Sequence, residues 1–237
     1  MSTIKLTDAA KYYKEEEHQV KAFEWLEKHV SQDTLAKFGL IYREGGDREK
    51  PNNSIEGSKP SKIYVDINAL AGIWGCSTSL IEDYEVDELN ACLEFFEITT
   101  PSRIRHFLSQ TAHESGGGKW KKELSDGWYL EGRTDIGNTE PGDGPRFKGG
   151  GYLQTTGRYN YQRLSDYLKD PKVMDGVDYV ADNYPFTAAG YWWMDNKMNA
   201  LCDTNPTVEA VTLRVNGGYN GLDDRKYYYN KCLKYIN

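Results

Sequence analysis

The stretch Arg105-His106-Phe107-Leu108-Ser109-Gln110-Thr111-Ala112-His113-Glu114-Ser115-Gly116-Gly117-Gly118 decides how this chain is interpreted. Its apolar stripe recurs at the helical positions i, i+3, i+4, i+7 and i+8, and consists of Ile104, Phe107, Leu108, Thr111 and Ala112. Thr100 followed by Pro101 is a favourable N-cap and first helical residue, and the three glycines are a plausible stop. The pattern therefore predicts a helix over 101–115.

Glu114 lies seven residues after Phe107, which is close to two helical turns, so both side chains project along nearly the same line. The carboxyl should then leave the apolar side of the helix at its last turn. Desolvation disfavours the charged form and raises the pKa of such a carboxyl, as a general acid near neutral pH requires. A solvated glutamate at a helix end is equally consistent with this stretch alone.

A second informative stretch is Phe147-Lys148-Gly149-Gly150-Gly151-Tyr152-Leu153-Gln154-Thr155-Thr156-Gly157-Arg158-Tyr159-Asn160-Tyr161. Three glycines allow backbone to approach backbone or ligand closely. The run lacks Gly-Lys-Ser/Thr and no apolar strand leads into it, so it is not a phosphate loop. The side chains that could line a sugar groove here are Gln154, Thr156, Tyr159 and Asn160.

Together the two stretches resemble the chitinase-like glycoside hydrolases of family 19, in particular the lysozyme-like endolysins of phages. The motifs that carry the resemblance are His113-Glu114-Ser115-Gly116-Gly117, residues 147–156, Val215-Asn216-Gly217-Gly218 followed by Arg225, and Ala188-Ala189-Gly190-Tyr191-Trp192-Trp193. The resemblance covers about residues 86–237. Three positions depart from the family pattern: Gly150 replaces a usual arginine, Tyr152 a smaller residue, and Thr155 an apolar one.

The resemblance implies a role for each matching residue. Glu114 matches the general acid, and Glu123, nine residues further on, matches the general base. Thr156 matches the hydroxyl that holds the attacking water, and Arg225 matches a basic residue near the acid. The implied substrate-binding set is His113, Gln154, Tyr159, Asn160, Asn216 and Arg225.

Glycoside hydrolysis typically needs one protonated and one ionised carboxyl beside the scissile bond. The resemblance implies inversion, which requires the two carboxyls to be roughly 6.5–9.5 Å apart. Lys119, Lys121 and Lys122 precede Glu123 and should favour its ionised form. Glu131 is the alternative base, although an ion pair with Arg133 is the simpler interpretation of that residue.

Composition bounds the remaining possibilities. The 237 residues suffice for one substantial domain with a small appendage, and a mean hydropathy of -0.74 argues against a membrane-inserted protein. The net charge of -7 argues against nucleic acid as the main partner. We expect a monomer that uses no cofactor. The N-terminus has no apolar signal region, so we expect the protein in the host cytoplasm until its release to the cell wall.

Cysteine and histidine usage gives no reason to expect a metal site. The four cysteines include no Cys-x-x-Cys, and free thiols are expected, with a Cys202–Cys232 bridge as the alternative. Of the four histidines, His106 and His113 are predicted to face solvent on the helix over 101–115. This poor set of metal ligands speaks against a zinc amidase or peptidase.

The chain is predicted to be mainly α: a lysozyme-like two-lobed catalytic domain over 61–237 with an N-terminal helical appendage over 1–60. The appendage should be a helical hairpin, 7–30 and 31–41, followed by a polar linker. It could pack on the main domain or bind a wall or partner. Residues 63–84 hold an apolar segment of unclear type. Helices are expected over 87–96, 101–115, 157–169, 185–198, 206–215 and 223–235.

These observations predict a peptidoglycan-degrading endolysin that hydrolyses β-1,4 bonds between amino sugars by an inverting two-carboxylate mechanism. A chitinase is the close alternative, because chitin presents the same 2-acetamido sugars. A non-catalytic wall-binding relative is the alternative from a different class, and Gly150 in place of arginine is the feature that favours it.

Overall fold

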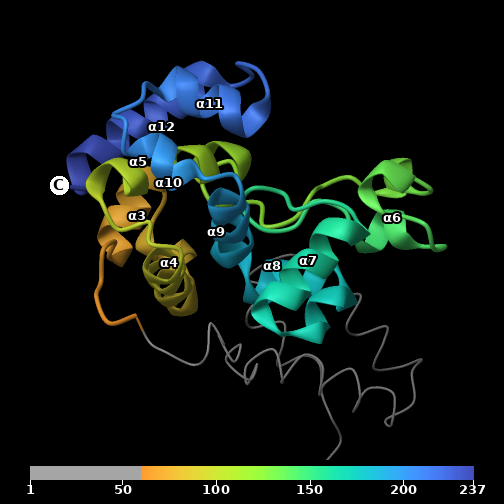
Figure 1. Ribbon diagram of the computed structural model, residues 1–237. Helices are drawn as coiled ribbons and strands as arrows, with labels where there is room; N and C mark the ends of the chain where they lie inside the picture. Colours follow the sequence, from red (N-terminus) through yellow and green to blue (C-terminus); the bar gives the residue numbers. More distant parts are fainter. Residues whose placement is uncertain (1–59) are drawn as a thin grey trace, which may run out of the picture. The chain divides into compact units, whose positions relative to one another are not determined.

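The computed structural model describes residues 60–237. The predicted helical hairpin over 7–41 lies outside the described residues, as does nearly all of the predicted linker. The described part is built from helices joined by loops and short 3-10 turns (Figure 1). No helix in this part of the chain is both long and apolar enough to cross a membrane. The α-helices are α3 (Ile67–Trp74), α4 (Asp83–Phe95), α5 (Pro101–Glu114), α6 (Asp143–Arg146), α7 (Arg158–Leu168), α8 (Val177–Asn183), α9 (Pro185–Asp195), α10 (Met198–Cys202), α11 (Val208–Asn216) and α12 (Leu222–Tyr235).

Helix α5 begins as the sequence predicts. The Thr100 hydroxyl accepts a hydrogen bond from the backbone N–H of Arg103, and Pro101 occupies the first turn. At the other end, Gly116, Gly117 and Gly118 all have positive φ, which stops the helix just after Glu114. The predicted helix over 101–115 is confirmed.

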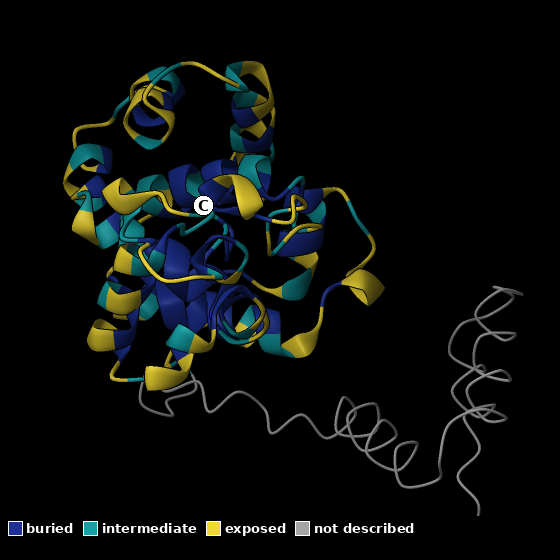
Figure 2. Ribbon diagram, turned by 90° about the vertical axis from the view of Figure 1, so that its right-hand side faces the viewer, coloured by how far each residue is buried: buried dark blue, intermediate teal, exposed yellow. Residues whose placement is uncertain are grey.

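The largest hydrophobic cluster surrounds α5 and contains buried residues of α3, α4, α9, α11 and α12. Phe107 of α5 meets the Trp193 ring edge-on, with the two ring centroids 5.3 Å apart. Trp193 therefore packs against this helix. Figure 2 shows how the buried residues concentrate in this helical core, while the exposed ones cover its outside.

A buried carboxylate joins two helices of this core. Glu88 of α4 accepts hydrogen bonds from the backbone N–H groups of Phe186 (2.9 Å) and Thr187 (2.6 Å), the otherwise unpaired donors at the start of α9. Burial raises the pKa of Glu88 to about 7. The contact satisfies the first turn of α9, where the preceding residue provides no side-chain cap.

A second, smaller cluster forms a separate core from α7, α8 and the 3-10 turn between them. Its buried residues are Phe147, Tyr161, Leu164, Leu168, Val173, Val180, Tyr184 and Ala188. Figure 1 shows α7 and α8 set apart from the group of α5, α11 and α12. Two cores connected through α9 agree with the predicted two-lobed, mainly α architecture.

Several helix boundaries differ from the predictions. Helix α4 begins at Asp83 rather than 87, because Glu82 and Glu85 form a capping box there. The segment expected as one helix over 185–198 ends at Asp195, and α10 restarts after Lys197, whose φ of 56° breaks the helical path. Helix α11 begins at Val208 rather than at 206, because the Thr207 side chain caps it.

Candidate active site

Glu114 is the last residue of α5, and its carboxylate is held by an arginine from α12. Arg225 is fully buried and forms an ion pair with Glu114, whose side chain is 27% exposed. The other terminal nitrogen of Arg225 donates to the Gln110 amide oxygen at 2.5 Å, and its Nε donates to the Asn220 carbonyl at 3.2 Å. Three partners therefore fix the guanidinium, and helix α12 packs along α5 at this point.

This arrangement corrects one prediction and agrees with another. Glu114 was expected to lie against apolar surface, but its nearest described partner is a buried guanidinium. Arg225 was expected near the acid, and the structure brings the two together. The implied roles of both residues in the reaction remain predictions.

Glu123 lies in the segment that follows α5, beside the glycine run. Its Oε1 accepts a hydrogen bond from the Tyr129 hydroxyl at 2.8 Å, and its Oε2 accepts one from the backbone N–H of Gly149 at 3.1 Å. Its own N–H donates to the Gly149 carbonyl at 2.8 Å. Partial burial, together with the Glu123 carboxylate, raises the pKa of Tyr129, which keeps this hydroxyl a donor at neutral pH.

The glycine run is pinned between two segments. Gly151 N donates to the Lys121 carbonyl at 2.7 Å, and Gly150 exchanges backbone hydrogen bonds with Thr155 at 3.0 and 2.8 Å. A Cβ at Gly150 would lie 2.4 Å from the Tyr161 hydroxyl, which donates to the Lys148 carbonyl. An arginine at position 150, which the family usually has, would therefore clash with the buried Tyr161 of this chain.

The polar residues after the glycine run form a local hydrogen-bond network next to it. Gln154 has a left-handed φ of 55°, and its amide nitrogen donates to the Gly151 carbonyl at 3.0 Å. The Thr156 hydroxyl donates to the Gln154 carbonyl at 2.8 Å, and the Asn160 side chain donates to the Thr156 carbonyl at 2.8 Å. Contacts through Gly149 and Gly151 therefore connect Glu123 to Gln154 and, through it, to Thr156.

The three remaining residues of the predicted substrate-binding set lie in different surroundings. The His113 ring Nδ1 lies 2.7 Å from an Asp224 carboxylate oxygen, and the ring packs against Gly221 at the start of α12. Tyr159 is 60% exposed, with the Arg163 guanidinium 5.7 Å from its ring centroid. Asn216 ends α11 and is exposed. Thus His113 directly precedes Glu114 on α5, whereas the structure does not connect Asn216 to either carboxylate.

Sequence reasoning did not single out the exposed aromatic residues around Glu123. Trp120 is 45% exposed, Trp128 58% and Tyr129 62%. Their proximity in sequence to Glu123 was a usable signal, because aromatic rings flanking a catalytic carboxyl can stack on sugar faces. Tyr129 also donates a hydrogen bond to Glu123, which no sequence pattern predicts.

The expected electrostatic environment of Glu123 is wrong in detail. Lys121 pairs with Glu85 at 2.9 Å, and Lys122 pairs with Asp178 at 2.6 Å. Neither ammonium group contacts Glu123. The donors that hold Glu123 are instead a tyrosine hydroxyl and a backbone amide.

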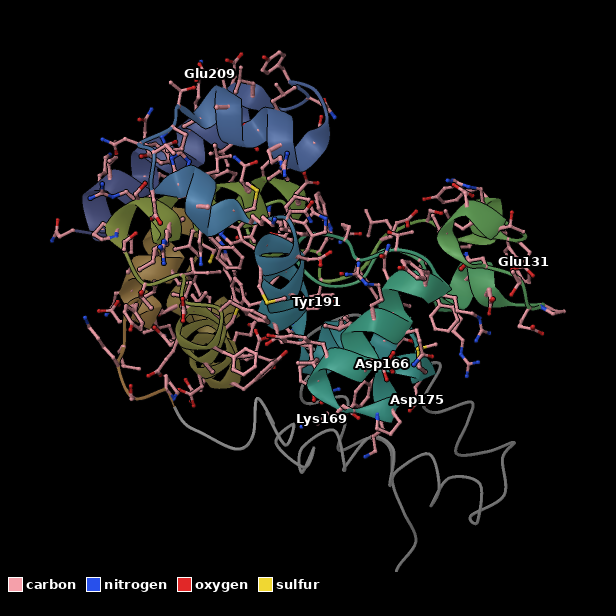
Figure 3. The ribbon with its side chains drawn as sticks, in the orientation of Figure 1. Glu131, Asp166, Lys169, Asp175, Tyr191 and Glu209 are labelled. Carbon is pink, nitrogen blue, oxygen red and sulfur yellow. The ribbon has the colours of Figure 1, made fainter. Side chains whose placement is uncertain are left out.

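The expected Glu131–Arg133 ion pair is also wrong. Arg133 pairs with Asp135 at 2.7 Å through Nε, while Glu131 accepts the backbone N–H groups of Gly142 (2.7 Å) and Gly144 (2.8 Å). Figure 3 labels Glu131 in this loop region beside α6. Both oxygens of Glu131 are used to tie the loop before α6, which favours a structural role over that of a base.

His106 does not face solvent as predicted. It is 1% exposed, and its ring lies 4.6 Å from the Tyr229 ring between centroids. Burial lowers the pKa of His106 to about 4, so it is neutral at physiological pH. The four cysteines are free thiols, so a Cys202–Cys232 bridge is not formed. Between residues 60 and 237, no group of three or more His, Cys, Asp and Glu side chains is placed to hold a metal.

This helical two-lobed, lysozyme-like fold holds one carboxylate at the end of a central helix and another beside a glycine run, and two carboxyls are what glycoside hydrolases typically use. Comparison with known proteins identifies the family. The chain is 30% identical over 158 residues to a glycosyl hydrolase family 19 domain-containing protein of Haemophilus influenzae, covering 54% of this chain and 76% of that protein. The chain belongs to glycoside hydrolase family 19.

Other similarities agree with this assignment. Over 117 residues the chain is 33% identical to an endochitinase of Arabidopsis thaliana, covering 48% of this chain but only 39% of the plant protein. Chitinase C of Streptomyces griseus has a similar fold, with a TM-score of 0.56 at 15% identity, over 75% of this chain and 94% of the chitinase. No protein-family model matches the chain.

Proposed function

We propose that this family 19 hydrolase cleaves β-1,4 bonds between the amino sugars of peptidoglycan by inversion, as a phage-type endolysin does once it reaches the wall. One observation carries the proposal: two partly exposed glutamates are each fixed by a different set of donors. Glu114 is held by Arg225, and Glu123 is held by the Tyr129 hydroxyl and Gly149 N–H. Glycoside hydrolysis typically uses two carboxyls, one as the acid and one as the base.

In this proposal Glu114 protonates the leaving glycosidic oxygen. Once the proton has left, Glu114 is an anion, and the buried Arg225 stabilises that anion through a charge-assisted hydrogen bond. Arg225 is itself fixed by Gln110 and Asn220, so it needs no reorganisation during the reaction. Leaving-group departure is therefore supported without a second acid.

In the same displacement Glu123 acts as the base and takes the proton that the attacking water loses. The Thr156 hydroxyl already donates its hydrogen to the Gln154 carbonyl, so toward a water it can only accept. An ionised Glu123 is likewise an acceptor. A water between them would give one hydrogen to each, which leaves an oxygen lone pair free to attack the sugar carbon.

Exposed aromatic rings would provide the sugar contacts. Trp120 and Trp128 lie on either side of Glu123 in sequence and present large apolar faces to solvent. Such faces stack on the apolar side of pyranose rings. Binding by stacking suits a polymer of repeating sugars, since each ring offers a similar face.

Chitin hydrolysis is the second candidate. The similarity to a plant endochitinase favours it, and the two carboxylates would serve either polymer. The nine-residue interval between Glu114 and Glu123 resembles the compact bacterial and phage members of the family and favours peptidoglycan.

Mass spectrometry of digests separates these candidates. The protein and its Glu114→Gln variant should be incubated with purified peptidoglycan and with chitin. New reducing ends from peptidoglycan, absent with the variant, are expected, and the terminal sugar identifies which bond is cleaved. Products from chitin alone would transfer the assignment to a chitinase, and no new reducing ends from either polymer would contradict hydrolysis.

A further inference from the structure

A pocket of about 370 Å³ lies away from the two carboxylates, where α9 ends and α10 and α11 follow. Its size suits a small ligand or one segment of a larger one. Neither Glu114 nor Glu123 lines it. The residues that do are Asn196, Lys197, Leu201, Ala210, Leu213 and Arg214. We refer to these six residues as the α10–α11 pocket.

Two cations of this pocket have no anionic partner among residues 60–237. In the part of the chain that the structure describes, neither Lys197 nor Arg214 forms an ion pair, and the Arg214 guanidinium only approaches the Asn196 carbonyl at 3.5 Å. Other cations among residues 60–237, such as Arg146 and Lys172, also form no ion pair. What distinguishes Lys197 and Arg214 is that both line the same pocket.

The neighbouring acidic side chains are committed elsewhere. Asp195, just before the pocket, receives two hydrogen bonds from Arg163, at 3.0 and 2.8 Å. Asp203, just after α10, receives two from Arg103, at 2.8 and 2.6 Å. On α11, Glu209 pairs with Lys226 and is labelled in Figure 3. Among residues 60–237, these pairings leave Lys197 and Arg214 without an ion-pair partner.

The rest of the pocket wall is apolar. Leu201, Ala210 and Leu213 line it, and Leu213 is 45% exposed. An inorganic anion would gain nothing from this wall. A carboxylate on a short aliphatic chain would use both parts, because its charge meets the two cations while its carbon atoms cover the leucines.

We propose that the α10–α11 pocket binds a carboxylate of the short peptide that branches from the glycan strand of peptidoglycan. This inference rests on the proposed function, since chitin carries no such peptide. Arg214 lies two residues before Asn216, the α11 residue that the family resemblance places in the sugar groove. The two side chains leave α11 on different sides, so a glycan lying along Asn216 would reach the pocket only through its peptide branch, around the last turn of the helix.

Direct binding tests the pocket independently of glycosidic cleavage. The probe is the free stem tetrapeptide, compared with the same peptide after amidation of its carboxylates, titrated into the full-length protein by NMR. Lys197→Gln/Arg214→Gln removes both charges. Lys169→Gln/Lys234→Gln is the matched control, because it removes the same net charge from exposed positions outside the pocket. Lys169, which directly follows α7 and is labelled in Figure 3, has the same left-handed backbone as Lys197.

The free peptide should shift the amide signals of Leu201, Ala210 and Leu213. We expect affinity to fall about tenfold in Lys197→Gln/Arg214→Gln and after amidation, and to weaken with salt in the native protein and the control. Equal affinity in both double variants, or shifts confined to other helices, would overturn the inference. Peptide binding without glycosidic cleavage of the wall would overturn the proposed function while supporting this pocket. Cleavage without peptide binding would support the proposed function and overturn the inference about this pocket.

Discussion

Tyr129 offers the sharpest test of how Glu123, the proposed base, is held. Its hydroxyl donates to Glu123 Oε1 at 2.8 Å, and its ring is 62% exposed. Tyr129→Phe removes that one donor and keeps the ring, so any stacking on sugar should survive. A hydrogen bond to a charged group contributes about 1.5–3 kcal/mol. Because water can replace the hydroxyl at this exposed position, we take a lower value of about 1 kcal/mol.

A loss of about 1 kcal/mol in the reacting complex lowers kcat about fivefold. KM and melting temperature should stay near those of the native protein, because neither the ring nor the core changes. Initial rates on a soluble oligosaccharide over a range of substrate concentrations separate kcat from KM. Tyr227→Phe is the control: Tyr227 is 54% exposed on α12, away from Glu123 in sequence, and should have no effect.

An unchanged kcat in Tyr129→Phe would refute the idea that this hydroxyl positions the base. A raised KM with unchanged kcat would show instead that the hydroxyl binds substrate.

Three further predictions address the acid, the choice of base and a buried histidine. Glu114→Gln should reduce wall lysis at least about 100-fold with folding intact, because it cannot protonate the leaving oxygen; near-normal lysis by purified variant protein would contradict its role. Glu123→Gln should nearly abolish turnover, whereas Glu131→Gln should mainly lower the melting temperature, since its oxygens hold the Gly142 and Gly144 amides; measured rates showing Glu131 to be the more damaging site would reverse the assignment. His106, with a pKa lowered from 6.5 to about 4, binds fewer protons in the folded state, so its contribution to stability is lost as pH falls from 6.5 toward 4. Relative to His106→Phe, the native protein should lose about 3 kcal/mol of unfolding free energy between pH 7 and 4, as measured by urea unfolding. Both proteins contain Glu88, so its opposing effect cancels in the comparison. Equal pH dependences of the two proteins would contradict the burial argument.

The sequence predicted the features that depend on local patterns. Helix α5 begins at Thr100 and Pro101 and stops at the glycines because caps and glycines act within a few residues. The pairing of Arg225 with Glu114 was accessible only through the family resemblance, because 111 positions separate the two residues.

What failed depended on tertiary packing. The apolar stripe identified one buried face of α5, but the opposite face packs on α11 and α12, which also buries His106 and Gln110. Lys121 and Lys122 lie beside Glu123 in sequence, yet carboxylates from other segments bind them. Glu131 binds backbone amides rather than the nearby Arg133, because a loop 11 positions away folds over it. Sequence proximity is a poor guide to the partner of a charged side chain when distant segments supply better geometry.

The central claim is that Glu114 and Glu123 work as an inverting pair. Proton NMR of a short β-linked oligosaccharide digest, read before mutarotation, tests it most directly. If Glu123 activates water held with Thr156, the first product is the α-anomer. An initial β-anomer would contradict the account, because it would require a covalent or substrate-assisted intermediate instead of direct attack by water.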